Sequence, residues 1–324
     1  MTIQITDEDA NQRIDKYLKR MLKEAPLSFI YKMFRQKDVK VNGKKATIDY
    51  ILAPGDTIDL YLKPALLEQF HKEALTRPVK ADFKIYYEDK NVLIVEKPKG
   101  VLVHSDARED KYTLHNMVLG YLEEKGEYDP KALNGFVPSP AHRLDRNTSG
   151  IVVFGKTLPA LQELLVLFRE RTLIEKKYIL LVRGECAKSG TIDLPLWKDC
   201  NLHKVFVKKV EAGGKPALTS YTRTKYYPSG FSLVEAELLT GRTHQLRVHF
   251  AAIGHPIVGD EKYGDFALNK EFEKGFSLKS QFLHAAYFAF KKGIPGVLAP
   301  LSGMEFTSPL PEKLQGILTE LDRL

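Results

Sequence analysis

A stretch without any regular hydrophobic pattern divides the chain into two unequal parts. Residues 64–80 contain two prolines, Pro64 and Pro78, and show neither the period of a helix nor that of a strand. Segments of this kind between patterned regions are typical of linkers. We therefore expect a small N-terminal domain over residues 1–63, a linker over residues 64–80 and a larger domain over residues 81–324.

The first part has the pattern of two helices followed by a β-hairpin. In the segment QRIDKYLKRML, apolar residues recur at helical spacing. After Pro26, Ser28 is placed to cap a second helix with the sequence SFIYKMFRQ. The pair Asn42–Gly43 then favours a tight hairpin turn, and an alternating strand follows in APGDTIDLYL. This order predicts a small α/β domain.

The larger part combines short strand patterns with separate helices. The strand patterns occur at residues 84–89, 91–98, 150–157, 176–185 and 231–241. An amphipathic helix is expected over residues 158–171, with Thr157 as its cap, and a second one near the C-terminus over residues 308–324. Because helices and long loops separate the strands unevenly, regular β–α alternation is excluded. We predict an α+β domain with a mixed, largely antiparallel sheet.

The charge of the chain indicates the kind of partner it binds. Lysine and arginine outnumber aspartate and glutamate by 49 to 41, which gives a formal net charge of +8. A basic excess favours polyanions such as nucleic acids. Basic side chains of the N-terminal part are expected to form a face that neutralises phosphates. The candidates for this contact are Arg13, Lys16, Lys32, Arg35, Lys37 and Lys44.

Several classes of protein are excluded by missing features. The two cysteines, Cys186 and Cys200, form neither a disulfide framework nor a C-x-x-C pair, so we expect reduced thiols. The N-terminus lacks a signal peptide, and no apolar stretch approaches the ~18 residues of a membrane span. We therefore predict a soluble cytoplasmic protein that does not contact a membrane.

Known cofactor patterns are also missing. The sequence has no glycine-rich nucleotide-binding loop and no H-E-x-x-H pattern, and its histidines do not cluster at metal-ligand spacing. We predict neither a metal nor a nucleotide cofactor. Any chemistry must then use ordinary side chains.

The segment HRLDRNTSG places one carboxylate, Asp145, between two arginines and ends in turn-forming residues. One interpretation is an exposed ion pair beside a loop, which contributes little to stability. The other is an ionised carboxylate that acts as a nucleophile on an anionic substrate. The residues of this segment alone do not decide between the two.

A second basic segment, GRTHQLRVHF, has arginines and histidines close together. We expect a helix after the Thr240–Gly241 turn. On such a helix Thr243 and Arg247 share a face, because they are four residues apart, whereas His244 points elsewhere. The alternative is a solvated basic helix without a specific role.

These two segments, together with EKPKGVLVHSD and EKKYILLVRG, resemble the sequence motifs of the RluA-type RNA pseudouridine synthases. The family's R-L-D motif falls on residues 143–145, its K-x-Y motif on residues 176–178, and its G-R-T-H-Q-[IL]-R motif on residues 241–247. The N-terminal part resembles an S4 RNA-binding domain. The resemblance spans essentially the whole chain and is strongest to the C type, which acts on the ribosomal large subunit. Ala141 and Asn147 depart mildly from the family pattern.

The resemblance implies roles for the motif residues. Asp145 would be the nucleophile, Arg247 its ion-pair partner, and Tyr178 the residue that lies against the target base. Because a stacked or paired uridine must be extruded before it can react, Arg143 would fill the space that it leaves. The other positions expected near the substrate are His142, Lys176, Arg242 and His244. For the two histidines, structural packing is an equal alternative.

The favoured function is isomerisation of uridine to pseudouridine in large-subunit (23S-type) ribosomal RNA, by a monomer. The alternative from another class is a non-catalytic S4-type RNA-binding or ribosome-assembly protein. That alternative explains the charge, but not an acidic residue held between arginines, because a pure phosphate binder would gain affinity by losing it. An RNA methyltransferase is a third possibility, and the missing glycine-rich loop speaks against it.

Overall fold

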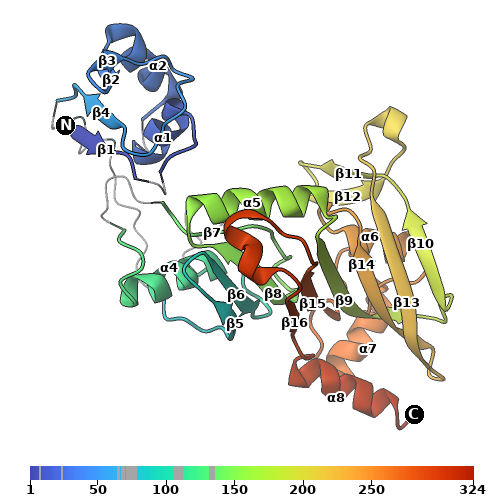
Figure 1. The fold of residues 1–324 in the computed structure, drawn as a ribbon. Helices are drawn as coiled ribbons and strands as arrows, with labels where there is room; N and C mark the ends of the chain where they lie inside the picture. The colour runs from blue at the N-terminus through green and yellow to red at the C-terminus, as the bar shows by residue number, and fades with distance from the viewer. Residues whose placement is uncertain are drawn as a thin grey trace.

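The computed structural model describes residues 1–6, 9–22, 25–63, 66, 70, 79–104, 112–130 and 136–324. Two large sheets, which pack in separate hydrophobic cores, organise most of these residues, and a two-stranded sheet adds to them (Figure 1). Most of the predicted linker, residues 64–80, lies outside the described residues. The predicted domain limits therefore stay predictions.

The N-terminal unit is built on a four-stranded antiparallel sheet with strand order β1-β4-β2-β3. Its elements are β1 (Thr2–Gln4), α1 (Ile14–Met21), α2 (Leu27–Gln36), β2 (Val39–Val41), β3 (Lys44–Lys45) and β4 (Thr57–Leu60). Apolar side chains of both helices, among them Ile14, Leu18 and Ile30, are buried with Ile58 of β4. The helix–helix–hairpin prediction is confirmed.

Two local details of this unit test the sequence analysis. Asn42 and Gly43 both have positive φ, 51° and 74°, as the predicted tight turn requires. The predicted cap of α2 is wrong, because Pro26 is the N-cap residue and Ser28 already lies inside the helix. The ring of Pro26 favours the extended backbone that precedes a helix. Because a proline side chain has no hydrogen-bonding group, α2 begins without a side-chain cap.

The larger unit is organised by a ten-stranded sheet. Its main path runs in the order β10-β13-β14-β9-β15-β8-β6-β5. These strands are β5 (Ile85–Glu88), β6 (Val92–Lys97), β8 (Ser149–Gly155), β9 (Ile174–Arg183), β10 (Ser189–Asp193), β13 (Leu218–Tyr227), β14 (Phe231–Leu238) and β15 (Leu283–Phe290). Short strands β7 (Ser139–Pro140) and β16 (Glu305–Thr307) pair beside this path. Neighbouring strands are antiparallel except β15 and β8, which are parallel, so the mixed, largely antiparallel α+β prediction is confirmed.

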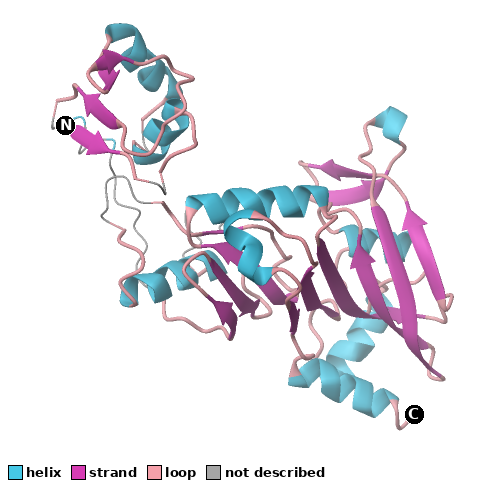
Figure 2. Ribbon diagram, viewed as in Figure 1, coloured by secondary structure: helices cyan, strands magenta, loops and turns pink. Residues whose placement is uncertain are grey.

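Helices cover both faces of this sheet (Figure 2). Both faces of the sheet are apolar, as alternate residues of β6 show. Leu93 and Val95 pack in one core cluster, and Val92 and Ile94 pack in another. The first cluster includes residues of α4 (Leu114–Glu124) and α6 (Gln245–Ala252), and the second includes residues of α5 (Leu158–Glu170). The remaining elements are α7 (Phe266–Phe276), α8 (Glu312–Leu321), the hairpin β11 (Leu196–Asp199) and β12 (Lys204–Val207), and the 3-10 helices η1 (Val210–Ala212) and η2 (Gly296–Leu301).

The predicted start of α5 agrees with the structure. The Thr157 side chain accepts a hydrogen bond from the Ala160 amide and so caps α5, with Pro159 in the first turn.

Cys186 and Cys200 are both free thiols, as expected. In the part of the chain that the structure describes, no helix is long and apolar enough to cross a membrane.

Candidate active site

The three motif segments meet at one open cavity of about 480 Å³. Its walls come from the loop before β8, from the end of α5 and the start of β9, and from the loop that leads into α6. Among the described residues that line it, Asp145 is the one acidic side chain. The basic side chains in its lining are Arg143, Arg171, Lys176, Lys198, Arg242 and Arg247. The cavity is therefore strongly cationic around a single carboxylate.

Asp145 and Arg247 form an ion pair across the cavity. Arg247 Nη1 donates to Asp145 Oδ2 at 3.0 Å, although the two residues are 102 positions apart in the sequence. The Asp145 side chain is 26% exposed and that of Arg247 only 7%. The carboxylate of Asp145 is therefore accessible from the cavity, while the guanidinium of Arg247, which binds it, is buried.

A second carboxylate, Asp260, fixes Arg247. Arg247 Nε and Nη2 donate to the two oxygens of Asp260 at 2.7 and 2.8 Å, which is a bidentate pair. Asp260 is fully buried and also accepts hydrogen bonds from the Lys262 and Tyr263 amides. Burial opposes its ionisation, but the bonds from Arg247 and these amides outweigh burial and lower the pKa of Asp260. Asp260 thus positions the arginine that holds Asp145.

The start of α6 differs from the prediction. The helix begins at Gln245 instead of directly after Gly241, and His244 precedes it in the left-handed conformation with φ 53°. The Gln245 side chain accepts the Arg242 amide hydrogen at 3.0 Å and the Thr240 hydroxyl at 2.8 Å, which stabilises this turn. A left-handed residue turns the chain before the helix starts.

As a result, the expectation that His244 points away from Arg247 is wrong. His244 Nε2 lies 4.0 Å from Asp145 Oδ2, and His244 Nδ1 lies 2.8 Å from the hydroxyl of Tyr263. The same hydroxyl accepts the Val205 amide hydrogen at 2.8 Å. Burial lowers the pKa of His244, so the ring faces Asp145 mainly in its neutral form. Asp145 is therefore flanked by Arg247 on one side and by His244 on another.

Tyr178 forms an inner wall of the cavity. Its side chain is 4% exposed and belongs to the same core cluster as Leu144, next to Asp145. Burial raises the pKa of this phenol, so it is neutral at ordinary pH. An uncharged aromatic surface beside Asp145 is suited to contact a flat base.

Buried Lys176 and half-buried His142 form a pair next to Tyr178. Lys176 Nζ lies 3.0 Å from His142 Nδ1 and 5.5 Å from the centre of the Tyr178 ring. His142 Nε2 accepts the Val153 amide hydrogen at 3.2 Å, and the ring packs 4.5 Å from Phe168. Burial, and next the charge of Arg171, lower the pKa of Lys176 to about 7. The contacts of His142 thus favour the packing alternative for this residue.

We expect the pKa of Lys176 to be visible in the pH dependence of folding. Between pH 7 and about 10 the unfolded chain binds a proton at Lys176 that the folded chain does not, so the wild type gains stability as pH rises. A Lys176→Met variant lacks this slope. The free energy of unfolding of the variant minus that of the wild type should be highest at pH 7. This difference should fall toward pH 10, as the wild type gains stability. Urea unfolding at four pH values measures this.

Lys177→Met is the matched control for Lys176→Met. The neighbouring Lys177 forms partly exposed ion pairs with Glu175 at 3.1 Å and Glu235 at 3.2 Å. Its replacement should not reproduce the slope. A constant difference between Lys176→Met and the wild type from pH 7 to pH 10 would show that Lys176 is charged in the fold.

The other predicted substrate residues lie at the cavity rim. Arg143 and Arg242 are both exposed, and Arg242 Nε donates to the Pro216 carbonyl at 2.9 Å. The structure therefore brings all eight predicted catalytic and substrate residues to the lining of one cavity. The six basic residues predicted to bind RNA are all exposed on the N-terminal unit, and Arg13 among them pairs with Asp15 at 3.0 Å.

Buried contacts hold the loop that carries Asp145. Lys97 is fully buried, and its ammonium donates to the carbonyls of Pro98, Val101 and Arg146 at 2.7–2.9 Å. Further along, Ser149 Oγ lies 2.8 Å from His284 Nδ1 in β15. These contacts fix the loop at Arg146 and Ser149, which closely follow Asp145.

Sequence reasoning missed Asp260, Tyr263 and Lys97 as parts of this site. Lys97 lies in the segment EKPKGVLVHSD, and Asp260 and Tyr263 follow the segment GRTHQLRVHF, but none of the three is marked by periodicity or by spacing. No cluster of three or more potential metal ligands occurs within the described ranges.

Both parts of the chain match known protein families. The family model described as RNA pseudouridylate synthase matches residues 91–252, and that of the S4 domain matches residues 12–58. The ribosomal large subunit pseudouridine synthase C of Vibrio vulnificus (strain CMCP6) is 34% identical, over 98% of this chain and 96% of that protein. The protein of the same name from Escherichia coli (strain K12) is 33% identical with the same coverage.

Solved structures show the same fold. Human RNA Pseudouridylate Synthase Domain Containing 4 superposes with a TM-score of 0.58 at 22% identity, covering 74% of this chain and 93% of that one. Human RNA Pseudouridylate Synthase Domain Containing 1 gives a TM-score of 0.53 at 25% identity, covering 75% and 96%. The likeness covers about three quarters of the chain.

Proposed function

The chain belongs to the RNA pseudouridylate synthase family, and we propose that it isomerises uridine to pseudouridine in large-subunit ribosomal RNA. The names of the bacterial relatives support this substrate. The S4 domain and the net charge of +8 support an RNA partner. In bacteria like these relatives such RNA is cytoplasmic, so the proposal places the protein there, acting as a monomer without a cofactor.

The observation that carries the proposal is one reachable carboxylate in a cavity whose lining also contains four arginines and two lysines. Asp145 acts as the nucleophile and attacks either ribose C1′ or the uracil ring. In either case the N1–C1′ bond breaks and a C5–C1′ bond forms. The proton on C5 is lost to solvent and N1 gains one, so that product and substrate are isomers.

The neighbours of Asp145 have supporting roles in this proposal. Arg247, held by Asp260, orients the carboxylate of Asp145 through a hydrogen bond. Tyr178 lies against the base, and its buried neutral phenol adds no charge that would repel the substrate. Arg143, exposed at the rim, fills the space left when the uridine is flipped out of its stack.

Release of tritium from ribosomal RNA labelled at uridine C5 tests the proposal. The enzyme should release tritium and leave pseudouridine in the RNA, because the C5 proton is exchanged during the reaction. The alternative, a non-catalytic RNA-binding or ribosome-assembly protein, binds the same RNA and releases none. Binding without release would therefore reject the proposed activity.

The exposed lysines of the N-terminal unit should set affinity but not chemistry. In a Lys32→Gln, Lys37→Gln, Lys44→Gln variant we expect weaker RNA binding, with a log Kd against log salt slope smaller by about one unit per lost phosphate contact. The kcat at saturating RNA should stay unchanged. Filter binding at several salt concentrations measures the slope.

Arg13→Gln provides the comparison for the lysine variant. Arg13 already pairs with Asp15, so its loss should change the slope less than the loss of one lysine. An unchanged salt slope in the triple lysine variant would remove this face from the RNA contact.

A further inference from the structure

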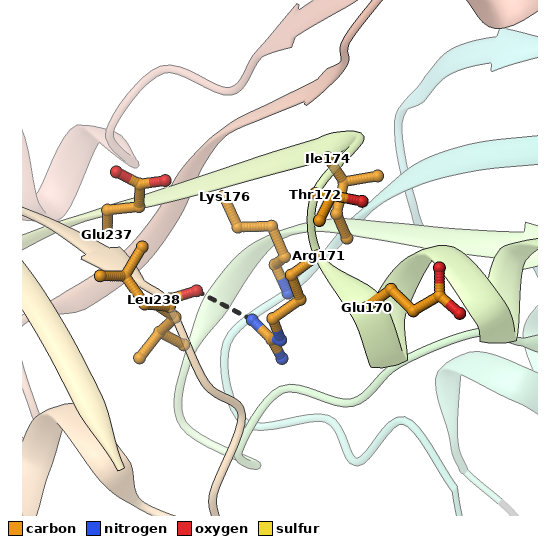
Figure 3. A pocket seen from close by; sticks show the side chains of 8 residues that line it. Glu170, Arg171, Thr172, Ile174, Lys176, Glu237 and Leu238 are labelled. Atoms are coloured by element: carbon orange, nitrogen blue, oxygen red, sulfur yellow. Dashed lines mark hydrogen bonds between the residues drawn. The ribbon is translucent and has the colours of Figure 1, made fainter. Parts of the chain in front are cut away.

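Arg171 lies between the active-site cavity and a second, smaller cavity. It follows the last residue of α5, in the left-handed conformation with φ 59°. The second cavity has about 170 Å³ and shares Arg171, Lys176 and Leu238 with the lining of the first. In Figure 3 the side chains of Arg171 and Lys176 lie side by side at the centre of this second cavity.

Among the residues that the structure describes, the guanidinium of Arg171 has no carboxylate partner. Its Nη1 donates to the Leu238 carbonyl at 2.9 Å, and no acidic side chain of the described residues lies within ion-pair distance. The carboxylates of Glu170 and Glu237, which also line the second cavity, point away from it in Figure 3. Arg247, in contrast, has two carboxylate partners.

The guanidinium of Arg171, which lacks a carboxylate partner among the described residues, belongs to a half-buried side chain. Burial lowers the pKa of Arg171 and the charge of Arg242 lowers it further, although the interaction with Tyr178 opposes this shift. Removing a charge from water without a partner is costly. The arrangement is therefore suited to an anion that enters from the cavity.

Gly241 provides the space for the guanidinium. A Cβ atom at this position would lie 2.1 Å from Arg171 Nη2, so any side chain there would displace it. The guanidinium is thus fixed between the Gly241 backbone and the Leu238 carbonyl. Its remaining N–H groups are left for a ligand.

We propose that Arg171 binds the backbone phosphate next to the target uridine, where the two cavities meet. This rests on the proposed function. A guanidinium matches the geometry of a phosphate and forms charge-assisted hydrogen bonds to it. Phosphate contacts fix the position of a nucleic acid strand. A nucleotide whose base lies on Tyr178 beside Asp145 has its phosphates at the cavity boundary, and the second cavity receives the neighbouring nucleotide.

Single neutral linkages in the RNA test this contact. Substrate oligonucleotides carrying one methylphosphonate, either 5′ or 3′ of the target uridine, are bound by the wild type and by Arg171→Gln. We expect a methylphosphonate at one of the two linkages to lower the affinity of the wild type about tenfold. This is the contribution expected of one charge-assisted hydrogen bond. Arg171→Gln should lose about as much on normal RNA and should be insensitive to methylphosphonate at that linkage.

Two further variants separate this contact from an indirect structural effect. Gly241→Ala keeps the charge but displaces the guanidinium, and it should show the same insensitivity as Arg171→Gln. Arg169→Gln, on the exposed side of α5, should behave as the wild type. If Arg171→Gln stays as sensitive as the wild type to neutral linkages on both sides, the phosphate contact is wrong. Failure of the wild type to form pseudouridine would instead overturn the proposed function.

Discussion

Asp145→Asn is expected to abolish pseudouridine formation, by more than about 10⁴-fold, while RNA binding is kept. The asparagine has the same shape but cannot act as the nucleophile. Arg247 stays in place because Asp260 still holds it with two hydrogen bonds. Affinity should not fall, because the variant removes a negative charge from a cavity that binds a polyanion. Tritium release and filter binding on the same RNA measure the two effects.

Asp193→Asn serves as the control, because Asp193 is an exposed carboxylate on β10 outside the lining of the cavity. It should leave both measurements unchanged. Asp145 is partly exposed, so the free energy of unfolding of Asp145→Asn should stay within about 1 kcal/mol of the wild type. Product formed at the wild-type rate by Asp145→Asn would exclude this residue as the nucleophile.

The elements that were predicted have local signals, whereas β13, β15, α4 and α7 were not predicted. Thr157 and the apolar period after it predict α5, and Asn42–Gly43 predicts the first hairpin, without reference to the rest of the chain. Ser28 failed as a cap because two adjacent signals competed and the proline set the helix start. Strand order, including the parallel pair of β15 with β8, has no local signal at all.

The site was predictable only where a motif marked it. Asp145 and Arg247 meet over 102 residues, and it was the family resemblance, not spacing, that joined them. His244 was misplaced because a single left-handed residue redirected its side chain toward Asp145. Asp260 lies 13 residues after Arg247, a separation that matches no helical or strand period, so only the folded chain reveals the pair.

Replacement of Asp260 should have the largest effect on stability. Asp260→Asn leaves the buried guanidinium of Arg247 with one carboxylate, and removing one partner of a buried pair costs about 3–5 kcal/mol. Because the pKa of Asp260 is lowered in the fold, its contribution is fully present above the pKa of the unfolded chain and is lost as pH falls through the folded value. The difference from the wild type should thus be constant from pH 5 to 8 and should shrink below about pH 4.

A double variant can separate the effect of Asp260 on activity from its effect on stability. Asp260→Leu with Arg247→Met removes both buried charges, so much of the lost stability should return. Activity should stay lost, because Asp145 then has no arginine to orient it. Glu261→Gln, at the exposed neighbouring carboxylate, should change neither property. If the double variant regained activity along with stability, Asp260 would serve only the fold, and the orientation of Asp145 by Arg247 would not matter for catalysis.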